Sequence, residues 1–171
     1  MTTRVVGLDL SMTATGVALP DGGTLTVKPK GTGDRRLVVL RDTLSHLLSG
    51  ADLAVVEDMP ARLQANAAKA VGFVHGTVRT LLLDLQIPYA VVSPATLKAY
   101  ATGKGNADKT AMAIAALKRA GLEFGDDNEC DAAWLRWAGL DWMGHSEFSL
   151  PVAQRDRLDK ATWPVPKGTS S

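Results

Sequence analysis

The sequence predicts an α/β fold with a mixed five-stranded sheet and helices on both faces. Two observations support this prediction. Three short apolar runs separated by turn residues come first, as in a meander of neighbouring strands. Two further apolar runs then alternate with helical patterns, and a strand–helix–strand order favours parallel pairing. The early meander and the later strands together give a sheet of mixed direction.

The composition is typical of a globular protein. The chain has 171 residues, of which 46% are hydrophobic, and a net charge of +1, so it can bury a substantial core as one domain. It contains no apolar run of membrane-spanning length and no signal-peptide pattern, so we expect a cytoplasmic protein. The single cysteine, Cys130, excludes an internal disulfide and a cysteine-based zinc cluster. A net charge near zero neither requires nor excludes nucleic acid.

The first predicted strand covers residues 5–8, an apolar run rich in β-branched side chains that ends at Asp9. Apolar runs at 17–19 and 24–27 predict the next two strands, with a Pro-Asp-Gly-Gly turn between them. A buried carboxylate is costly unless it is paired, hydrogen-bonded or bound to a metal. Asp9 is therefore either the cap of a turn or a functional residue.

Apolar residues at helical spacing predict the remaining framework. A helix over 35–48, with Asp34 or Thr32 as its cap, leads to a strand over 53–56 that ends at Glu57. The later elements are a helix over 61–85, a strand over 87–92, and helices over 94–100, 110–120 and 129–139. Glu57 is thus the second acid at the end of an apolar strand.

Two glycines in the long helix, Gly72 and Gly76, lie four residues apart on one face. Each lowers helix propensity by about 1 kcal/mol relative to alanine. Such a pair usually marks the close approach of another element. The approaching element is either the sheet or a second subunit.

Acidic residues predict a metal site. Asp9 and Glu57 end strands, and Asp131 lies in the last main helix, with Asp127 and Asn128 four and three residues before it on roughly the same helix face. An oxygen-only cluster suits Mg²⁺ or Mn²⁺. Two such ions, about 3.5–4 Å apart, can activate a water molecule and stabilise the leaving oxygen in phosphodiester cleavage.

Four motifs, taken in order, resemble those of the RuvC-type Holliday junction resolvases, particularly the short forms carried by bacteriophages. They are GLDLSMTATGVAL (7–19), AVVEDMP (54–60), SPATLKAYATGKGNADK (93–109) and DDNECDAAWL (126–135). The resemblance covers about residues 5–142 and implies a ribonuclease H-like fold. It also implies a metal-dependent endonuclease that cleaves Holliday junctions, and possible action on other branched DNA, with two Mg²⁺ or Mn²⁺ ions at each site.

The resemblance also implies roles for individual residues. Asp9, Glu57 and Asp131 match the catalytic acids, and Lys109 matches a lysine near the scissile phosphate, where it would stabilise developing charge. The expected metal ligands are Asp9, Glu57, Asp127, Asn128 and Asp131. The expected DNA contacts are Thr13, Thr15, Lys98, Lys104 and Lys109.

Two positions depart from the family pattern. Asn128 stands where the family has a carboxylate, so either its carbonyl oxygen or the carboxylate of Asp127 could be the fourth ligand. We favour Asp127, because closely spaced cations need negative charge, although Asp127 could instead cap the helix. The family also has an aromatic wedge after the second acid, where this chain offers only Met59 and Leu63.

The predicted nuclease domain covers residues 1–145, and residues 146–171 form a C-terminal extension that is partly disordered, above all over 167–171. A modest basic stretch in it, Arg155 to Lys160, is read as a solvated helix or a DNA contact. A four-way junction has two-fold symmetry, so we expect a homodimer, with the helix over 61–85 as its interface. If the chain is encoded by a phage, it acts in the host cytoplasm.

Two other functions remain open at this point. One is an ATP-binding phosphotransferase of the actin and sugar-kinase type, which shares the fold and a similar first-strand motif but requires two such lobes. The other is a non-catalytic DNA-binding module of the same fold. The presence of Asp9, Glu57 and Asp131 argues against the second alternative.

Overall fold

The computed structural model describes residues 2–168 and has a five-stranded sheet in the order β3-β2-β1-β4-β5. The strands are β1 (Val5–Asp9), β2 (Thr15–Ala18), β3 (Thr24–Val27), β4 (Leu53–Glu57) and β5 (Tyr89–Val92). The first three strands pair antiparallel, whereas β4 runs parallel to both β1 and β5. The predicted mixed sheet is confirmed.

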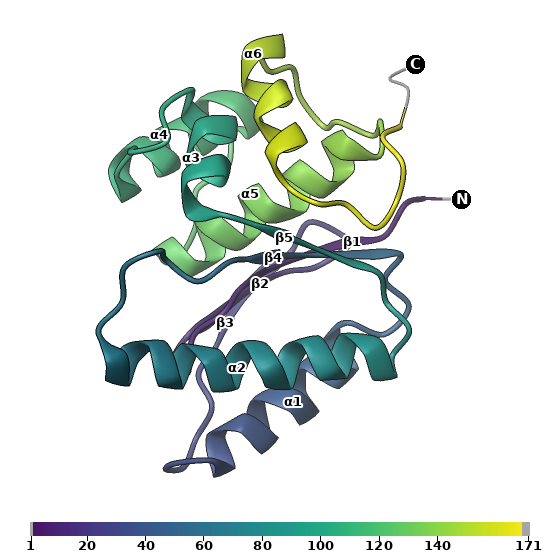
Figure 1. Ribbon diagram of the computed structural model, residues 1–171. Coiled ribbons are helices and arrows are strands. Elements are labelled where there is room, and N and C mark those ends of the chain that lie inside the picture. Colours follow the sequence, from purple (N-terminus) through teal and green to yellow (C-terminus); the bar gives the residue numbers. More distant parts are fainter. Residues whose placement is uncertain (1, 169–171) are drawn as a thin grey trace.

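Helices cover both faces of the sheet (Figure 1). They are α1 (Arg35–Leu47), α2 (Ala65–Asp84), α3 (Pro94–Thr102), α4 (Lys109–Ala120), α5 (Asp127–Trp142), α6 (Val152–Arg155) and the 3₁₀ helix η1 (Asp156–Lys160). Helices α1 and α2 lie on one face, and the later helices lie on the other, with α5 against the strands. In the described part of the chain, no helix is long and apolar enough to cross a membrane.

The alternation of side chains along the strands divides the core into two layers. One set of strand residues packs with α1 and α2: Val6, Leu8, Ala54 and Val56. The other set packs with α5: Val5, Leu53 and Val55. Asp9 and Glu57 continue the second set at a spacing of two, so both carboxylates lie on the α5 face of the sheet.

Helix α5 lies unusually close to the sheet because glycines face it. A Cβ on Gly7 would lie 2.0 Å from the carbonyl oxygen of Ala132, and one on Gly16 would lie 2.0 Å from that of Asn128. A Cβ on Gly139 would come within 2.7 Å of valine side chains of β1 and β4. The backbone of α5 therefore touches the strand backbones directly at Gly7 and Gly16, and at Gly139 it lies against strand side chains.

One of the two contacts predicted for Gly72 and Gly76, packing on the sheet, is wrong. A Cβ on either residue would meet nothing within 4 Å, so none of the described elements packs on that face of α2, and contact with a second subunit stays a prediction. Helix propensity gives the loss of helix stability caused by a glycine, but it does not show which element packs against that glycine. The helix also begins later than predicted, at Ala65, because Gln64 has an extended backbone. At α1, Asp34 is the N-cap residue, but its side chain makes no capping hydrogen bond.

The C-terminal extension folds back over α3 and α5. The rings of Trp142 and Trp163 stack with centroids 4.8 Å apart, and an isolated antiparallel bridge joins Thr162 to Val91 at the edge of the sheet. Lys167 and Gly168, which were expected to be disordered, are part of this packing, since the Gly168 N–H donates to Trp142 O at 2.8 Å. The rest of the segment predicted to be disordered, 169–171, lies outside the described residues.

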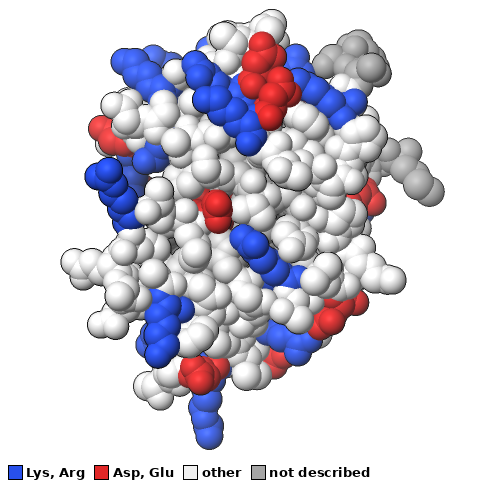
Figure 2. Space-filling view, in the orientation of Figure 1, with Lys and Arg blue, Asp and Glu red and all other residues white. Residues whose placement is uncertain are grey.

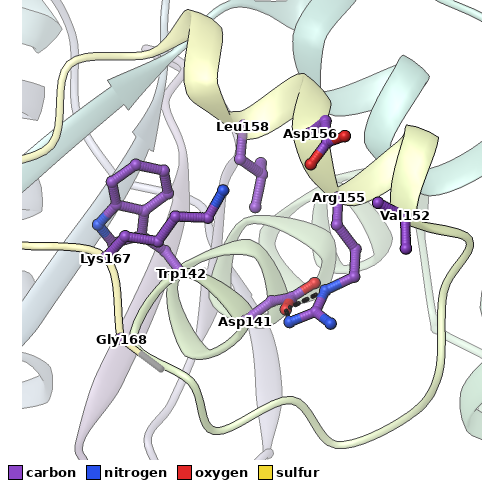
Figure 3. A pocket seen from close by; sticks show the side chains of 8 residues that line it. All are labelled: Asp141, Trp142, Val152, Arg155, Asp156, Leu158, Lys167 and Gly168. Atoms are coloured by element: carbon purple, nitrogen blue, oxygen red, sulfur yellow. Dashed lines mark hydrogen bonds and ion pairs between the residues drawn. The ribbon is translucent and has the colours of Figure 1, made fainter. Parts of the chain in front are cut away.

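A buried polar network fastens the extension. Arg155 donates from Nε to Asp141 at 2.7 Å, Tyr100 donates its hydroxyl to the same carboxylate at 3.2 Å, and Gln154 donates to Tyr100 O at 2.7 Å. Beside the Asp141–Arg155 pair lies a pocket of about 190 Å³ (Figure 3), lined by Asp141, Trp142, Val152, Arg155, Asp156, Leu158, Lys167 and Gly168. Arg155 is therefore a structural ion-pair partner and not part of a solvated helix.

We predict that Gly7→Ala will lower the free energy of unfolding by about 3 kcal/mol, because the added methyl group meets backbone atoms that cannot rotate away. Urea denaturation monitored by circular dichroism measures this change. Gly72→Ala is the matched control, and it should be neutral or stabilising by up to about 1 kcal/mol, because its methyl group enters open space. Equal effects of the two substitutions would contradict the close seating of α5.

Candidate active site

Two carboxylates lie at the same edge of the sheet. β1 and β4 are parallel neighbours, and their register pairs Leu8 with Val56, so the next residue of each strand, Asp9 and Glu57, lies at the carboxyl end. Both side chains are half-buried on the α5 face. Parallel strands bring their carboxyl ends together, and residues 48 positions apart in the sequence thus become neighbours.

The third carboxylate, Asp131, comes from the start of α5, which is fixed by hydrogen bonds from β3. Asp126 caps the helix by accepting from the Glu129 N–H at 3.0 Å, and it also accepts from the Thr26 hydroxyl at 2.7 Å. The Thr24 hydroxyl donates to Glu129 at 2.7 Å. These bonds, with the close approach at the glycines, hold Asp131 near Asp9.

Burial and repulsion from neighbouring carboxylates raise the pKa of all three acids, and for Asp131 the neighbour is Asp127. Burial is the largest cause of the raised pKa for each acid. The pKa of Asp9 rises to about 7, with a further contribution from Asp131. The pKa of Glu57 rises to about 8, with contributions from Asp9 and Asp131, and that of Asp131 rises to about 6. The three carboxylates therefore form one electrostatic cluster with too little positive charge around it.

Two predicted lysines lie beside this cluster. Lys109, the first residue of α4, lowers the pKa of Asp9 and Asp131, and Lys98 on α3 lowers that of Glu57 and Asp131. Lys104 is exposed on the loop between α3 and α4. On the face shown in Figure 2, lysine and arginine side chains are scattered and form no continuous patch. Positive charge at the acids thus comes from individual lysines.

The donor chemistry fits a hard divalent cation, because the three acids offer only carboxylate oxygens and lack positive charge. Their side chains do not converge on one point as they stand. Across residues 2–168, no three His, Cys, Asp or Glu side chains are grouped closely enough to hold an ion. Binding would therefore require the carboxylates to turn toward a common centre.

The two predicted threonines differ in their surroundings. Thr15 is buried, donates to Ser11 O at 2.8 Å and accepts from the Ser11 N–H at 3.1 Å. Its hydroxyl shapes the turn after β1, so the predicted DNA contact of Thr15 is withdrawn. Thr13 is exposed, with its hydroxyl 3.3 Å from that of Ser11, and remains a candidate DNA contact.

The two candidates for a fourth ligand also differ. Asp127 is not the helix cap, because Asp126 occupies that position. Asp127 is exposed, and its carboxylate lies 2.8 Å from the Lys109 ammonium. Asn128 is half-buried, and its backbone carbonyl lies against Gly16. The structure therefore brings Asp127 to the rim of the cluster, as a partner of Lys109.

Several residues that build the site were missed in the sequence. Thr24 and Thr26 were read only as part of a strand, although residues two apart share a face and their hydroxyls hold the start of α5. The close approach of Gly7 was missed, and Gly16 was read only as a turn residue. The pairing of β1 with β2 places Gly16 opposite Asp9. The packing role of the glycines can be inferred only when it is known which helix covers that face of the sheet.

Comparison with known proteins shows no match to a family model. The curated crossover junction endodeoxyribonuclease RuvC of Halorhodospira halophila is 27% identical over 162 residues, covering 88% of this chain and 96% of that protein. RuvC of Paenarthrobacter aurescens is 27% identical over 125 residues. That alignment covers 66% of each protein, so the chain matches just under two thirds of the length of this relative.

Solved structures share the fold. Thermus thermophilus RuvC aligns with a TM-score of 0.68 at 20% identity, covering 86% of this chain and 100% of that one. The same protein in complex with a Holliday junction substrate gives 0.67, also at 20% identity, with 78% and 90% covered. The yeast mitochondrial Holliday junction resolvase Ydc2 gives 0.53 at 13% identity, with 93% and 80% covered.

These relatives and structures agree with the resemblance carried by the four motifs, and they agree on the ribonuclease H-like fold. A bacteriophage origin stays a prediction. Motifs, relatives and fold thus agree that the chain is similar to the RuvC-type resolvases.

Proposed function

We propose that this protein is a metal-dependent, structure-selective DNA endonuclease that cleaves Holliday junctions, with other branched DNA as further candidate substrates. The observation that carries the proposal is the cluster of Asp9, Glu57 and Asp131, three acids with raised pKa values from two strands and a helix. Support also comes from curated relatives named as crossover junction endodeoxyribonucleases and from a RuvC structure described with a Holliday junction.

In this proposal, Asp9, Glu57 and Asp131 hold two Mg²⁺ or Mn²⁺ ions. When bound, such ions supply the Lewis acidity that activates water and stabilises the leaving oxygen in phosphodiester hydrolysis. Lys98 and Lys109 lie beside the acids, where their ammonium groups bind phosphate oxygens and stabilise the charge that develops during cleavage. Thr13 and Lys104, both exposed, contact the DNA farther from the acids.

The comparisons do not favour the phosphotransferase alternative, since the relatives and neighbours that carry an argument are resolvases. The non-catalytic alternative differs from the proposal only in activity. A labelled four-way junction with Mg²⁺, run beside an ATP-hydrolysis assay, separates all three functions. Junction nicking selects the nuclease, ATP hydrolysis selects the phosphotransferase, and binding without either selects the non-catalytic module.

Asp9→Asn should reduce cleavage of a four-way junction by at least about a hundredfold, equivalent to about 2.7 kcal/mol of transition-state stabilisation. The substitution keeps the shape of the side chain but removes the charge that attracts a cation. Binding of the junction should be unchanged or tighter, because repulsion of phosphates decreases. Gel assays of cleavage and binding measure both quantities. Asp42→Asn, at an exposed position of α1, is the control, and near-normal cutting by Asp9→Asn would refute the assignment of the acids.

The stability of the metal-free protein should fall as the pH rises from about 4 to about 8. As the pH rises, the folded protein keeps protons on Asp9, Glu57 and Asp131 after the unfolded chain has lost them. The stability that these groups contribute is therefore present at low pH and is lost as they ionise in the folded protein. Melting temperatures in EDTA measure this change. Added Mn²⁺ should raise the melting temperature more at pH 8 than at pH 5.

Glu57→Gln should raise the melting temperature at pH 8 in EDTA, because it removes a carboxylate that is costly to ionise. The control is Glu123→Gln, which changes an exposed carboxylate between α4 and α5. If wild type and Glu57→Gln show the same pH dependence, the acids do not form a coupled cluster.

The proposed enzyme acts as a homodimer through α2, since a two-fold symmetric junction requires two active sites. Two exposed apolar side chains of α2 and two of α1 support this interface. Phe73 is 46% and Leu83 66% exposed, with the open position of Gly76 between them. On α1, Val38 is 59% and Val39 39% exposed.

Leu83→Glu should shift the protein from dimer to monomer in sedimentation velocity, because it places a charge in the proposed apolar interface. Gly76→Leu should also weaken the dimer, by filling the space that the partner helix requires. Leu122→Glu is the control, since Leu122 is 45% exposed on the opposite side of the sheet. A wild-type protein that is strictly monomeric both free and on a junction would exclude this assembly.

A further inference from the structure

An ion pair joins the starts of two helices beside the acid cluster. Lys109 is the first residue of α4, Asp127 is the first residue of α5, and their Nζ and Oδ2 atoms are 2.8 Å apart. A helix N-terminus carries a partial positive charge, which favours an aspartate and disfavours a lysine. The stability of α4 therefore does not explain a lysine at this position.

Lys109 interacts with two groups of negative charge. Besides its ion pair with Asp127, the carboxylates of Asp131 and Asp9 raise the pKa of its ammonium group. The side chain is 73% exposed, and a lysine on a four-carbon stem has many rotamers when nothing holds it. The bond to Asp127 selects rotamers that keep the ammonium group near the acid cluster.

Among the described residues, the Asp127 side chain makes no ion pair or hydrogen bond other than the one with Lys109. Asp126 caps α5, and the threonines of β3 bind Asp126 and Glu129. The Asp127 side chain is 52% exposed, whereas Asp9 and Asp131 are half-buried. It thus lies at the rim of the cluster, on the side of Lys109.

We propose that Asp127 is a positioning residue that holds Lys109 for the scissile phosphate, and that it is not a metal ligand. This proposal rests on the function proposed above. A lysine ammonium group has three N–H donors. One donates to Asp127, and two remain for phosphate oxygens beside the acids.

A double-mutant cycle with two measurements tests this proposal. Cleavage is measured at saturating junction and Mg²⁺, and Mn²⁺ binding is measured by electron paramagnetic resonance on DNA-free protein. Asp127→Asn should lower the cleavage rate about tenfold, as expected for misplacement of one charge-stabilising group. It should leave Mn²⁺ affinity within about twofold of wild type, whereas Asp9→Asn should reduce it strongly.

The second half of the cycle uses Lys109→Ala. In that background Asp127→Asn should cause no further loss beyond about twofold, because residues that act as a unit are not additive. Asp127→Glu should keep most of the rate, since it retains the charge. Glu123→Gln, an exposed carboxylate on the preceding loop, is the control and should match wild type.

Three results would overturn the proposal: weaker Mn²⁺ binding by Asp127→Asn, recovery of its cleavage by excess Mg²⁺, or an equal loss of rate in both backgrounds. If wild type cuts no branched DNA, the proposed function fails, and a cycle of unfolding free energies then decides about the ion pair. Non-additive stabilities support the Lys109–Asp127 pairing in that case, and additive stabilities refute it.

Discussion

The contact between the backbone of α5 and the strands at Gly7 and Gly16 is the constraint on which the site depends. Both glycines lie on the face of the sheet that carries Asp9, and Gly16 is its cross-strand partner. Because neither glycine has a side chain, the start of α5 packs directly against the end of β1. This seating brings Asp131 to Asp9 and limits the water around them, so one packing feature determines both the geometry and the raised pKa values.

The same packing makes the site costly to fold. Three half-buried carboxylates repel one another, and their ionisation opposes folding at neutral pH. Hydrogen bonds at the start of α5 oppose that repulsion, because Asp126 and Glu129 are each bound by a threonine of β3. Lys98 and Lys109 lower the pKa values of the acids and act in the same direction. The remaining deficit of positive charge favours the binding of cations.

The sequence allowed the sheet and the helix layers to be predicted, because hydrophobic periodicity is a local signal, and it placed Asp9 and Glu57 at the ends of strands. Contacts between helices and strands were harder to predict from the sequence. The glycine pair of α2 predicted contact with the sheet or with a second subunit, and the sheet does not lie against it, whereas the packing glycine of β1 was missed. The hydroxyls of Thr13 and Thr15 look alike in the motif, and only burial separates the exposed one from the one that shapes the turn.

Helix N-termini add partial positive charge near the acids. α3 begins directly after β5, whose Val92 pairs with Glu57, and α5 begins beside β3, so two helix N-termini lie near the carboxyl ends of the strands. Their partial positive charges favour the acids and also an approaching phosphate. A phosphate at this edge still meets three carboxylates, and two helix ends do not balance them. Bound cations and the two lysines must supply the rest, which is why the position of each lysine matters to the chemistry.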